Sequence, residues 1–255
     1  MIILKTPDEI KIMRAAGLAV AQILKRLEDE TKVGITTGEL NAIAEAETQA
    51  RGAVPLFKNY PNSKPGARPF PGAICASINE EVVHGIPGDR KLKEGDIISI
   101  DFGLLLDGFC GDAAVTIPVG KVSAKALKLV KTTEQALMKG IAQAKIGNRL
   151  GAVGNAVQSY AEKHSYSVVR EFVGHGIGRD MHEAPPVPNY GRADRGPALK
   201  AGMTIAIEPM VNEGGHGVYT KADDWTVVTK DGSLSAHFEH TVAITERGPI
   251  ILTSR

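Results

Sequence analysis

Two stretches of the sequence end an apolar, strand-like run on a carboxylate: GDIISID ends at Asp101, and GMTIAIE ends at Glu208. A second pair, DAAVTI from Asp112 and EHTVAI from Glu239, shares the pattern acid-x-x-Val-x-Ile. A single acid at a strand end is usually solvated, but the repetition favours a common site. Carboxylates gathered in one partly buried site disfavour one another's ionisation, and no lysine or arginine adjoins any of these four. Divalent cations would balance them, and four negative charges match two such ions.

The segment between Asp101 and Asp112 predicts how these two acids lie relative to each other. Asp107-Gly108 is typical of a two-residue type I′ hairpin turn. With that turn, Asp101 faces Ala114 on the opposite strand, and Asp112 lies two positions along the same face. The two aspartates are then diagonal neighbours, roughly 7–8 Å apart at the backbone, and both side chains can reach one small site.

The helices that must support these strands also occur twice. Capping signals and apolar spacing predict four helices, at about 6–29, 37–51, 123–144 and 149–163. At an offset of 113 residues, Val33-Gly34 aligns with Ile146-Gly147, and the acid-ending strands follow in the same order in both parts. We infer an internal duplication, and therefore an α+β fold with helices on one face of a sheet. The expected organisation is a single domain, 1–255, with pseudo-twofold halves of about 1–120 and 121–255.

Three histidines lie in glycine-containing phrases that would let the backbone approach a ligand closely. His84 follows a strand-like run in EEVVHGIPG, and His175 and His182 lie in VGHGIGRDMHEAP. Imidazole is a common ligand for borderline metals, although a plain loop histidine is the commoner case. The shared His-Gly-Ile context favours His84 and His175. Among the other histidines, we expect His240 to point to the opposite side of its strand from Glu239.

Composition limits the classes of partner and compartment. Of the 255 residues, 43% are apolar and 23% are charged, and the formal net charge of +1 argues against a general nucleic-acid binder. No run approaches the roughly 18 apolar residues of a membrane span, and MIILKTPDEIK lacks the apolar core of a signal peptide. Cys75 and Cys110 form no CxxC pair. We expect a cytoplasmic protein with reduced thiols, no membrane partner and, by default, a monomeric state.

With these residues identified, the sequence resembles the type I methionine aminopeptidases over essentially its whole length. The specific phrases are ICASINEEVVHGIPG, GDIISIDFG, DGFCGDAA, GHGIGRDMHEAP, MTIAIEPMV and DDWTVVTKDGSLSAHFEHT. The resemblance implies the curved "pita-bread" fold, with a mainly antiparallel sheet. It also implies two divalent cations per chain, with His175 on one metal only and with Asp101, Asp112, Glu208 and Glu239 as the other ligands. The donor set leaves the metal open among Co, Mn, Fe, Zn and Ni.

The resemblance further implies removal of methionine from nascent polypeptides and peptides with a small second residue, with the ribosome as one place of encounter. A metal-activated hydroxide would attack the first peptide bond. Glu208 would be the general acid/base, His182 would stabilise the carbonyl oxygen, and His84 would contact the scissile amide. The pocket for the methionine side chain would be lined by Cys75, Tyr60, Phe70 and Trp225.

Three features depart from the family pattern, and two alternative functions remain open. The Pro/Gly-rich segment 59–72 looks about seven residues longer than expected, Met181 replaces an aromatic residue, and Ala206 replaces a hydroxyl residue. The Xaa-Pro aminopeptidases share the five-ligand set but usually carry an additional N-terminal domain. A non-catalytic binding protein of the same fold would typically lack some ligands, whereas all five are present here.

Overall fold

The computed structural model describes residues 1–255 and contains four long helices in the predicted places. They are α1 (Pro7–Glu30), α2 (Thr37–Ala50), α3 (Ala124–Ile141) and α4 (Leu150–Lys163). Thr6 and Thr36 form capping boxes with Glu9 and Glu39, which satisfy the free N–H groups where α1 and α2 begin. Helix α3 ends a turn earlier than expected because the N–H groups of Gln143 and Ala144 bond three residues back rather than four.

Fifteen strands form one large sheet and two small ones, and every pairing is antiparallel. The nine-stranded sheet has the order β1 (Val54–Pro55), β4 (Ile97–Leu106), β5 (Phe109–Pro118), β14 (Glu239–Thr245), β9 (Thr204–Ile207), β7 (Gly174–Gly176), β8 (Glu183–Val187), with β2 (Ile74–Ile78) beside β4 and β15 (Gly248–Ile251) beside β14. One small sheet has the strand order β13 (Ser235–His237), β10 (Met210–Asn212), β6 (Ser167–Val168). The other has the order β11 (Val218–Thr220), β12 (Val227–Thr229), β3 (Glu81–Val83).

Strands β4 and β5 form the hairpin that the sequence predicts. Asp107 and Gly108 both have positive φ angles, 52° and 78°, as a type I′ turn requires. Asp101 pairs with Ala114, and Asp112 pairs with Gly103, so the predicted register is confirmed. A side chain at position 103 would begin 2.9 Å from Asp112 Oδ1, so glycine leaves room for that carboxylate.

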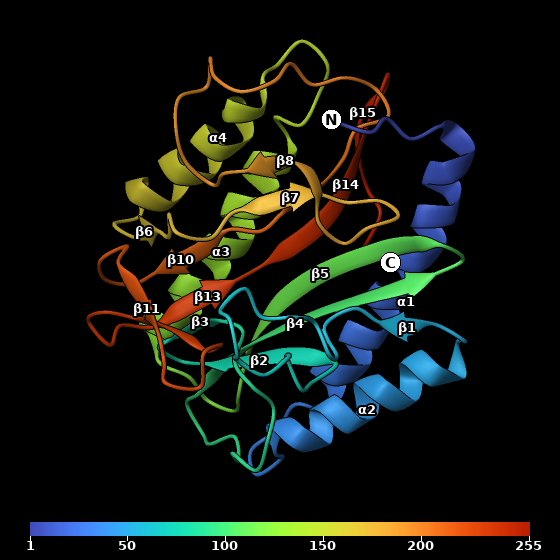
Figure 1. Ribbon diagram of the computed structural model, residues 1–255. Helices are drawn as coiled ribbons and strands as arrows, with labels where there is room; N and C mark the ends of the chain where they lie inside the picture. The colour runs from blue at the N-terminus through green and yellow to red at the C-terminus, as the bar shows by residue number, and fades with distance from the viewer.

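The two halves of the chain meet at the centre of the large sheet, where β5 and β14 lie side by side (Figure 1). Strand β4 flanks β5 and β9 flanks β14, and β2 and β7 lie outside these in turn. Helix α1 packs against β4 and β5, whereas α3 packs against β5, β9 and β13. Helices from both parts of the chain therefore pack against the strands of the large sheet, and α3 also contacts β5, which precedes it in the chain.

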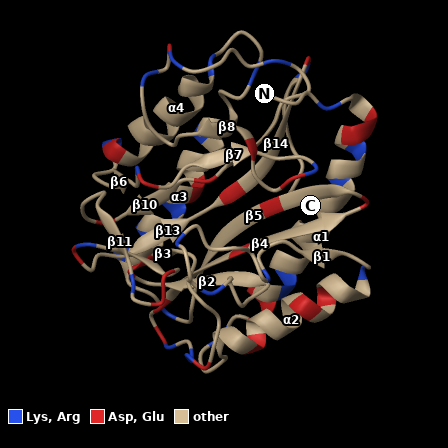
Figure 2. Cartoon of the chain, viewed as in Figure 1, with Lys and Arg blue, Asp and Glu red and all other residues tan.

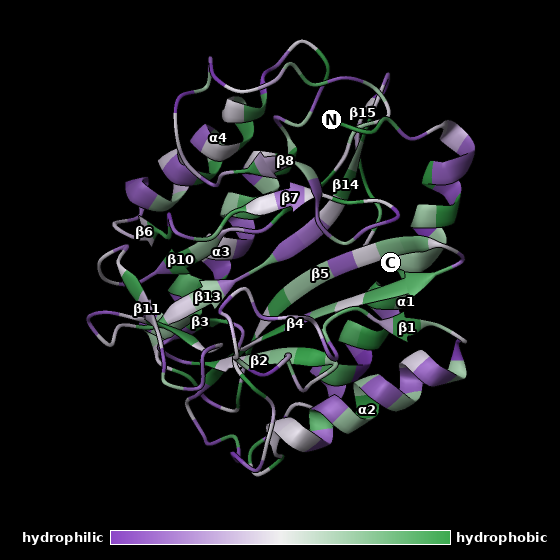
Figure 3. Cartoon of the chain, viewed as in Figure 1, coloured by the Kyte–Doolittle hydropathy of each residue, from purple (hydrophilic) through white to green (hydrophobic).

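Side-chain alternation separates an apolar face of the sheet from an acidic one. Ile100 and Phe102 of β4 belong to the core cluster that includes α1 and α2, so Asp101 between them points to the other face. On β14, Val242 and Ile244 join the core with α3 and α4. Hydrophilic segments interrupt the apolar β5 and β14 (Figure 3), and acidic residues mark the same strands (Figure 2). None of the helices is both long and apolar enough to cross a membrane.

Candidate metal centre

A cavity of about 220 Å³ contains all the residues that the sequence and the resemblance single out. Its lining includes, among others, Tyr60, Phe70, Cys75, His84, Asp101, Asp112, His175, His182, Glu208, Trp225 and Glu239. These residues come from both halves of the chain. Four acidic side chains line the cavity together with ten hydrophobic residues.

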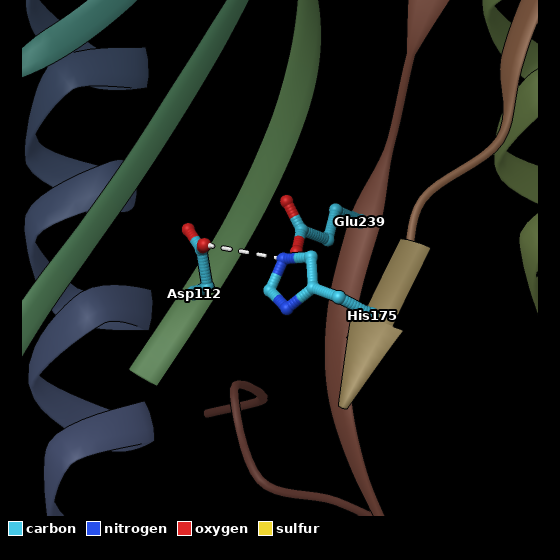
Figure 4. Close-up of side chains that lie close together, drawn as sticks. All are labelled: Asp112, His175 and Glu239. Carbon is cyan, nitrogen blue, oxygen red and sulfur yellow. Dashed lines mark ion pairs between the residues drawn. The ribbon is translucent and has the colours of Figure 1, made fainter. Parts of the chain in front are cut away.

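Three candidate ligands form the tightest group in the cavity. Asp112 of β5, His175 of β7 and Glu239 of β14 each offer one ligand atom, and these atoms lie within 4.8 Å of one another. Figure 4 shows the three side chains pointing toward a common centre from three different strands. Asp112 and Glu239 are almost completely buried, with 3% and 2% of their surfaces exposed. Acids held so close together without a basic partner are typical of a metal site.

The hydrogen bond of His175 determines which ring nitrogen faces the acids. Its Nδ1 lies 2.9 Å from the carbonyl oxygen of Gly176, which can only accept, so Nδ1 carries the proton. Nε2 therefore presents a lone pair, 3.5 Å from Glu208 Oε1 and 4.0 Å from Asp112 Oδ2. Burial and the neighbouring His182 lower the pKa of His175 to about 4, which keeps the ring neutral. A lone pair that faces carboxylate oxygens repels them unless a proton or a metal ion lies between, so this arrangement suits a bound cation.

The carboxylates of the site also lack a positively charged partner. Burial, followed by the mutual repulsion of these acids, raises the pKa of Asp101, Glu208 and Glu239 well above the ordinary range. Burial raises the pKa of Asp112 to about 7. One oxygen each of Asp101, Asp112 and Glu239 is buried without any hydrogen-bond partner. Buried polar atoms are normally bonded, so these oxygens fit coordination of divalent cations.

The other two predicted ligands lie at the edge of this group. Asp101 of β4 pairs with Cys75 of β2 and lines the same cavity, but it lies outside the tight cluster of three. Glu208 comes directly after β9, where the backbone leaves the sheet. Asn189 donates a hydrogen bond of 3.0 Å from Nδ2 to the carbonyl oxygen of Glu208 and holds the main chain at that point.

Two further imidazoles line the cavity. His182 is exposed, and its ring centre lies 4.4 Å from that of His175. His84 follows β3 with a positive φ of 59°, and burial and His182 lower its pKa to about 4. The shared His-Gly-Ile phrase does not mark equivalent positions. His175 lies in β7 beside β9, whereas the strand that flanks β4 in the first half is β2, not β3.

Aromatic side chains form the apolar wall. The rings of Phe70 and Trp225 meet edge to face at 5.2 Å, and the Trp225 indole N–H donates to the carbonyl of Arg68 over 2.9 Å. Segment 59–72 thus borders the cavity, and its polar residues Asn62 and Lys64 bond to Asp224. Sequence reasoning did not include the other apolar lining residues, because nothing in their local pattern separates them from ordinary core: Phe57, Val83, Phe172, Val173 and Met210. Met181, noted above as a departure, also lines the cavity.

His237 is a further residue to which the sequence pattern assigned no role. It is 1% exposed, and its Nε2 has no hydrogen-bond partner. Burial, and then the neighbouring His84, lower its pKa to about 3. The available signal in the sequence was its place two residues before Glu239, although His237 ends β13 and Glu239 begins β14. His240, by contrast, bonds through Nδ1 to Thr253 and borders residues of α1 and α3, as expected for the opposite face.

Comparison with known proteins relates the whole chain to one family. Residues 11–246 match metallopeptidase family M24. The chain is 54% identical over 253 residues to methionine aminopeptidase 1 of Bacillus subtilis (strain 168), covering 99% of each protein. The crystal structure of methionine aminopeptidase from Rickettsia prowazekii superposes with a TM-score of 0.95 at 45% identity, covering 99% of this chain and 100% of that one. The prolidase from Pyrococcus horikoshii OT3 shares the fold, with a TM-score of 0.77 at 23% identity over 99% of this chain and 63% of that one.

Proposed function

The chain belongs to metallopeptidase family M24, and we propose that it is a methionine aminopeptidase that removes the N-terminal methionine from polypeptides with a small second residue. The observation that carries this proposal is the group formed by Asp112, His175 and Glu239 inside a largely apolar cavity. Such a cavity offers hydrolytic chemistry at one end and a place for an unbranched apolar side chain at the other.

Divalent metals are the cofactor, and the donor atoms suit two of them. The proposed ligands are Asp101, Asp112, His175, Glu208 and Glu239. When bound there, the two cations would supply a water acidic enough to act as a nucleophile and positive charge for the carbonyl oxygen of the substrate. The donor set of carboxylates and one imidazole accepts Co, Mn, Fe, Zn or Ni.

Three side chains would act on the substrate itself. Glu208 is the proposed general acid/base, because it lines the cavity beside His175 and burial raises its pKa well above the ordinary range, which favours uptake of a proton. His182 would donate to the carbonyl oxygen of the first residue. His84, which follows β3 in the chain and has a left-handed backbone conformation, would contact the scissile amide.

The apolar wall would select the first residue. Cys75, Tyr60, Phe70 and Trp225 would surround the methionine side chain. Burial, with the charges of Asp101 and Asp112, raises the pKa of the Cys75 thiol well above the ordinary range, so it would act as an apolar contact and not as a nucleophile. At about 220 Å³ the cavity is smaller than sites for drug-sized ligands, which suits a single side chain.

The proposed partners are the N-termini of nascent polypeptides, met in the cytoplasm and at the ribosome by a monomeric enzyme. Metal-stripped protein incubated with a pool of Met-Ala, Met-Lys, Leu-Ala and Ala-Pro peptides, without and with Co²⁺ or Mn²⁺, tests the activity by mass spectrometry. We expect metal-dependent loss of methionine from Met-Ala alone. Cleavage confined to Ala-Pro would assign the chain to the proline peptidases instead. Stoichiometric metal binding without any cleavage would point to a binding protein.

A further inference from the structure

Tyr60 contacts His182 through its hydroxyl group as well as its ring. The phenol oxygen lies 2.7 Å from Nδ1 of His182, and the two rings meet edge to face with centres 5.5 Å apart. Neither atom has another hydrogen-bond partner in the structure. The contact joins residues 122 positions apart in the chain.

This contact constrains the proton of His182. A neutral imidazole carries one N–H, and the hydrogen bond made by one nitrogen decides which nitrogen holds it. If the phenol donates to Nδ1, the proton of His182 resides on Nε2. In the reverse arrangement the phenol proton would have no acceptor in the protein, and Nε2 would add a lone pair to a cavity already rich in carboxylate oxygens.

The structure holds both partners of this contact in place. The next residue, Glu183, is buried in an ion pair with Lys5 and accepts a hydrogen bond of 3.0 Å from the main chain of Arg179. Tyr60 is fixed by main-chain bonds from its own N–H to Phe57 and from Phe70 to its carbonyl, each of 2.9 Å. The main chain on either side is therefore anchored, while the exposed imidazole ring of His182 has only the phenol as a hydrogen-bond partner.

We propose that Tyr60 is a positioning residue that keeps the proton of His182 on Nε2, so that His182 presents an N–H donor to the carbonyl oxygen of the substrate. The role of His182 in this statement rests on the proposed function. The phenol ring borders the cavity, and its hydroxyl group in addition positions the imidazole of His182. Segment 59–72 thus supplies the hydroxyl of Tyr60 as a hydrogen-bond donor to the imidazole of His182.

Tyr60→Phe tests the proposal because it deletes the hydroxyl and retains the ring. In ¹H–¹⁵N correlation spectra of zinc-loaded protein, with His182 assigned through His182→Ala, we expect the wild-type ring to carry its proton on Nε2. Tyr60→Phe should shift the Nδ1 resonance of His182 by removing its donor. The kcat on a Met-Ala peptide should fall about 3- to 10-fold with KM changed less than about 2-fold, as for loss of one hydrogen bond. The matched control is Tyr219→Phe, whose side chain is 53% exposed.

A double-mutant cycle separates positioning from simple lining of the cavity. In the His182→Ala background, Tyr60→Phe should have no further effect on kcat. Equal losses in both backgrounds would overturn the proposal, as would a wild-type spectrum with the proton on Nδ1. The spectra do not depend on turnover, so an inactive wild-type protein would count against the proposed function and not against this inference.

Discussion

His175 Nε2 and Glu208 Oε1 lie 3.5 Å apart, and both atoms are hydrogen-bond acceptors when Glu208 is ionised. The proton of His175 is on the other nitrogen, bonded to the carbonyl of Gly176. Two acceptors at this distance repel unless a proton or a metal ion lies between them. The pair therefore defines one side of the proposed metal centre, where β7 and the end of β9 meet.

Glu208→Gln should abolish most of the activity. The amide retains the size of the side chain but can neither exchange a proton nor offer an anionic ligand. We expect kcat/KM for a Met-Ala peptide to fall by about 10²- to 10⁴-fold, the usual range for loss of a general acid/base. Metal content measured by mass spectrometry should fall as well. The control is Glu246→Gln, at an exposed turn between β14 and β15. Activity near the wild-type level in Glu208→Gln would exclude Glu208 as the general acid/base.

Asp112→Asn should have opposite effects on metal binding and on metal-free stability. Burial raises the pKa of Asp112 to about 7, so its ionised form destabilises the folded metal-free protein at higher pH. Removing the carboxylate should raise the free energy of unfolding of the metal-free variant by about 1–3 kcal/mol at pH 8. Urea titrations of metal-free protein measure this, and the same variant should lose metal-dependent stabilisation. A destabilised metal-free variant would contradict the prediction.

Metal binding should release protons, and more at lower pH. The folded pKa values of the carboxylates are raised, so between pH 4 and 7 the metal-free folded protein binds more protons than the unfolded chain. The stability contributed by these groups is thus present at low pH and lost as the pH rises toward 7. Metal displaces the protons, so its affinity should weaken as the pH falls from 7 to 5. Calorimetric titrations in two buffers with different ionisation heats give the proton count, and no release at pH 6 would refute the prediction.

Lys5→Ala should destabilise the protein far more than an ordinary surface change. The side chains of Lys5 and Glu183 are only 3% and 5% exposed, and removing the lysine leaves a buried carboxylate unpaired. We expect a loss of about 3–5 kcal/mol in the free energy of unfolding, measured with urea. Lys11→Ala is the control, since its pair with Asp8 is 79% and 87% exposed and should change stability by less than about 0.5 kcal/mol. Equal effects of the two substitutions on the free energy of unfolding would refute a stabilising role for the buried pair of Lys5 and Glu183.

Much of the scaffold could be predicted because its causes are local. The capping boxes of Thr6 and Thr36 act within four residues, and the Asp107-Gly108 turn alone fixes the pairing of Asp101 with Ala114. Strand alternation placed the acids on one face and His240 on the other. The repeated phrases identified the candidate residues, and all of the predicted site residues line one cavity.

The arrangement within that cavity depended on contacts between distant segments. The pairing of β5 with β14 places Glu239 beside Ala114, two residues from Asp112, and so brings these two acids together. The shared phrase around His84 and His175 gave no such information, because His175 lies in β7 of the large sheet, whereas His84 follows β3 of a small sheet. The burial of His237 and the bond from Tyr60 to His182 likewise have no local signature.

The sequence by itself determined which residues are candidates for the chemistry, which helices and strands hold them and which family the chain resembles. These follow from residue types and spacings of a few positions, where turn chemistry, capping and alternation operate. Only the tertiary structure decided which carboxylates share the imidazole of His175 and which nitrogen of that ring faces them. The reason is that these relationships depend on strand pairing and packing across more than a hundred residues, where small differences in register and loop path set distances of a few ångströms.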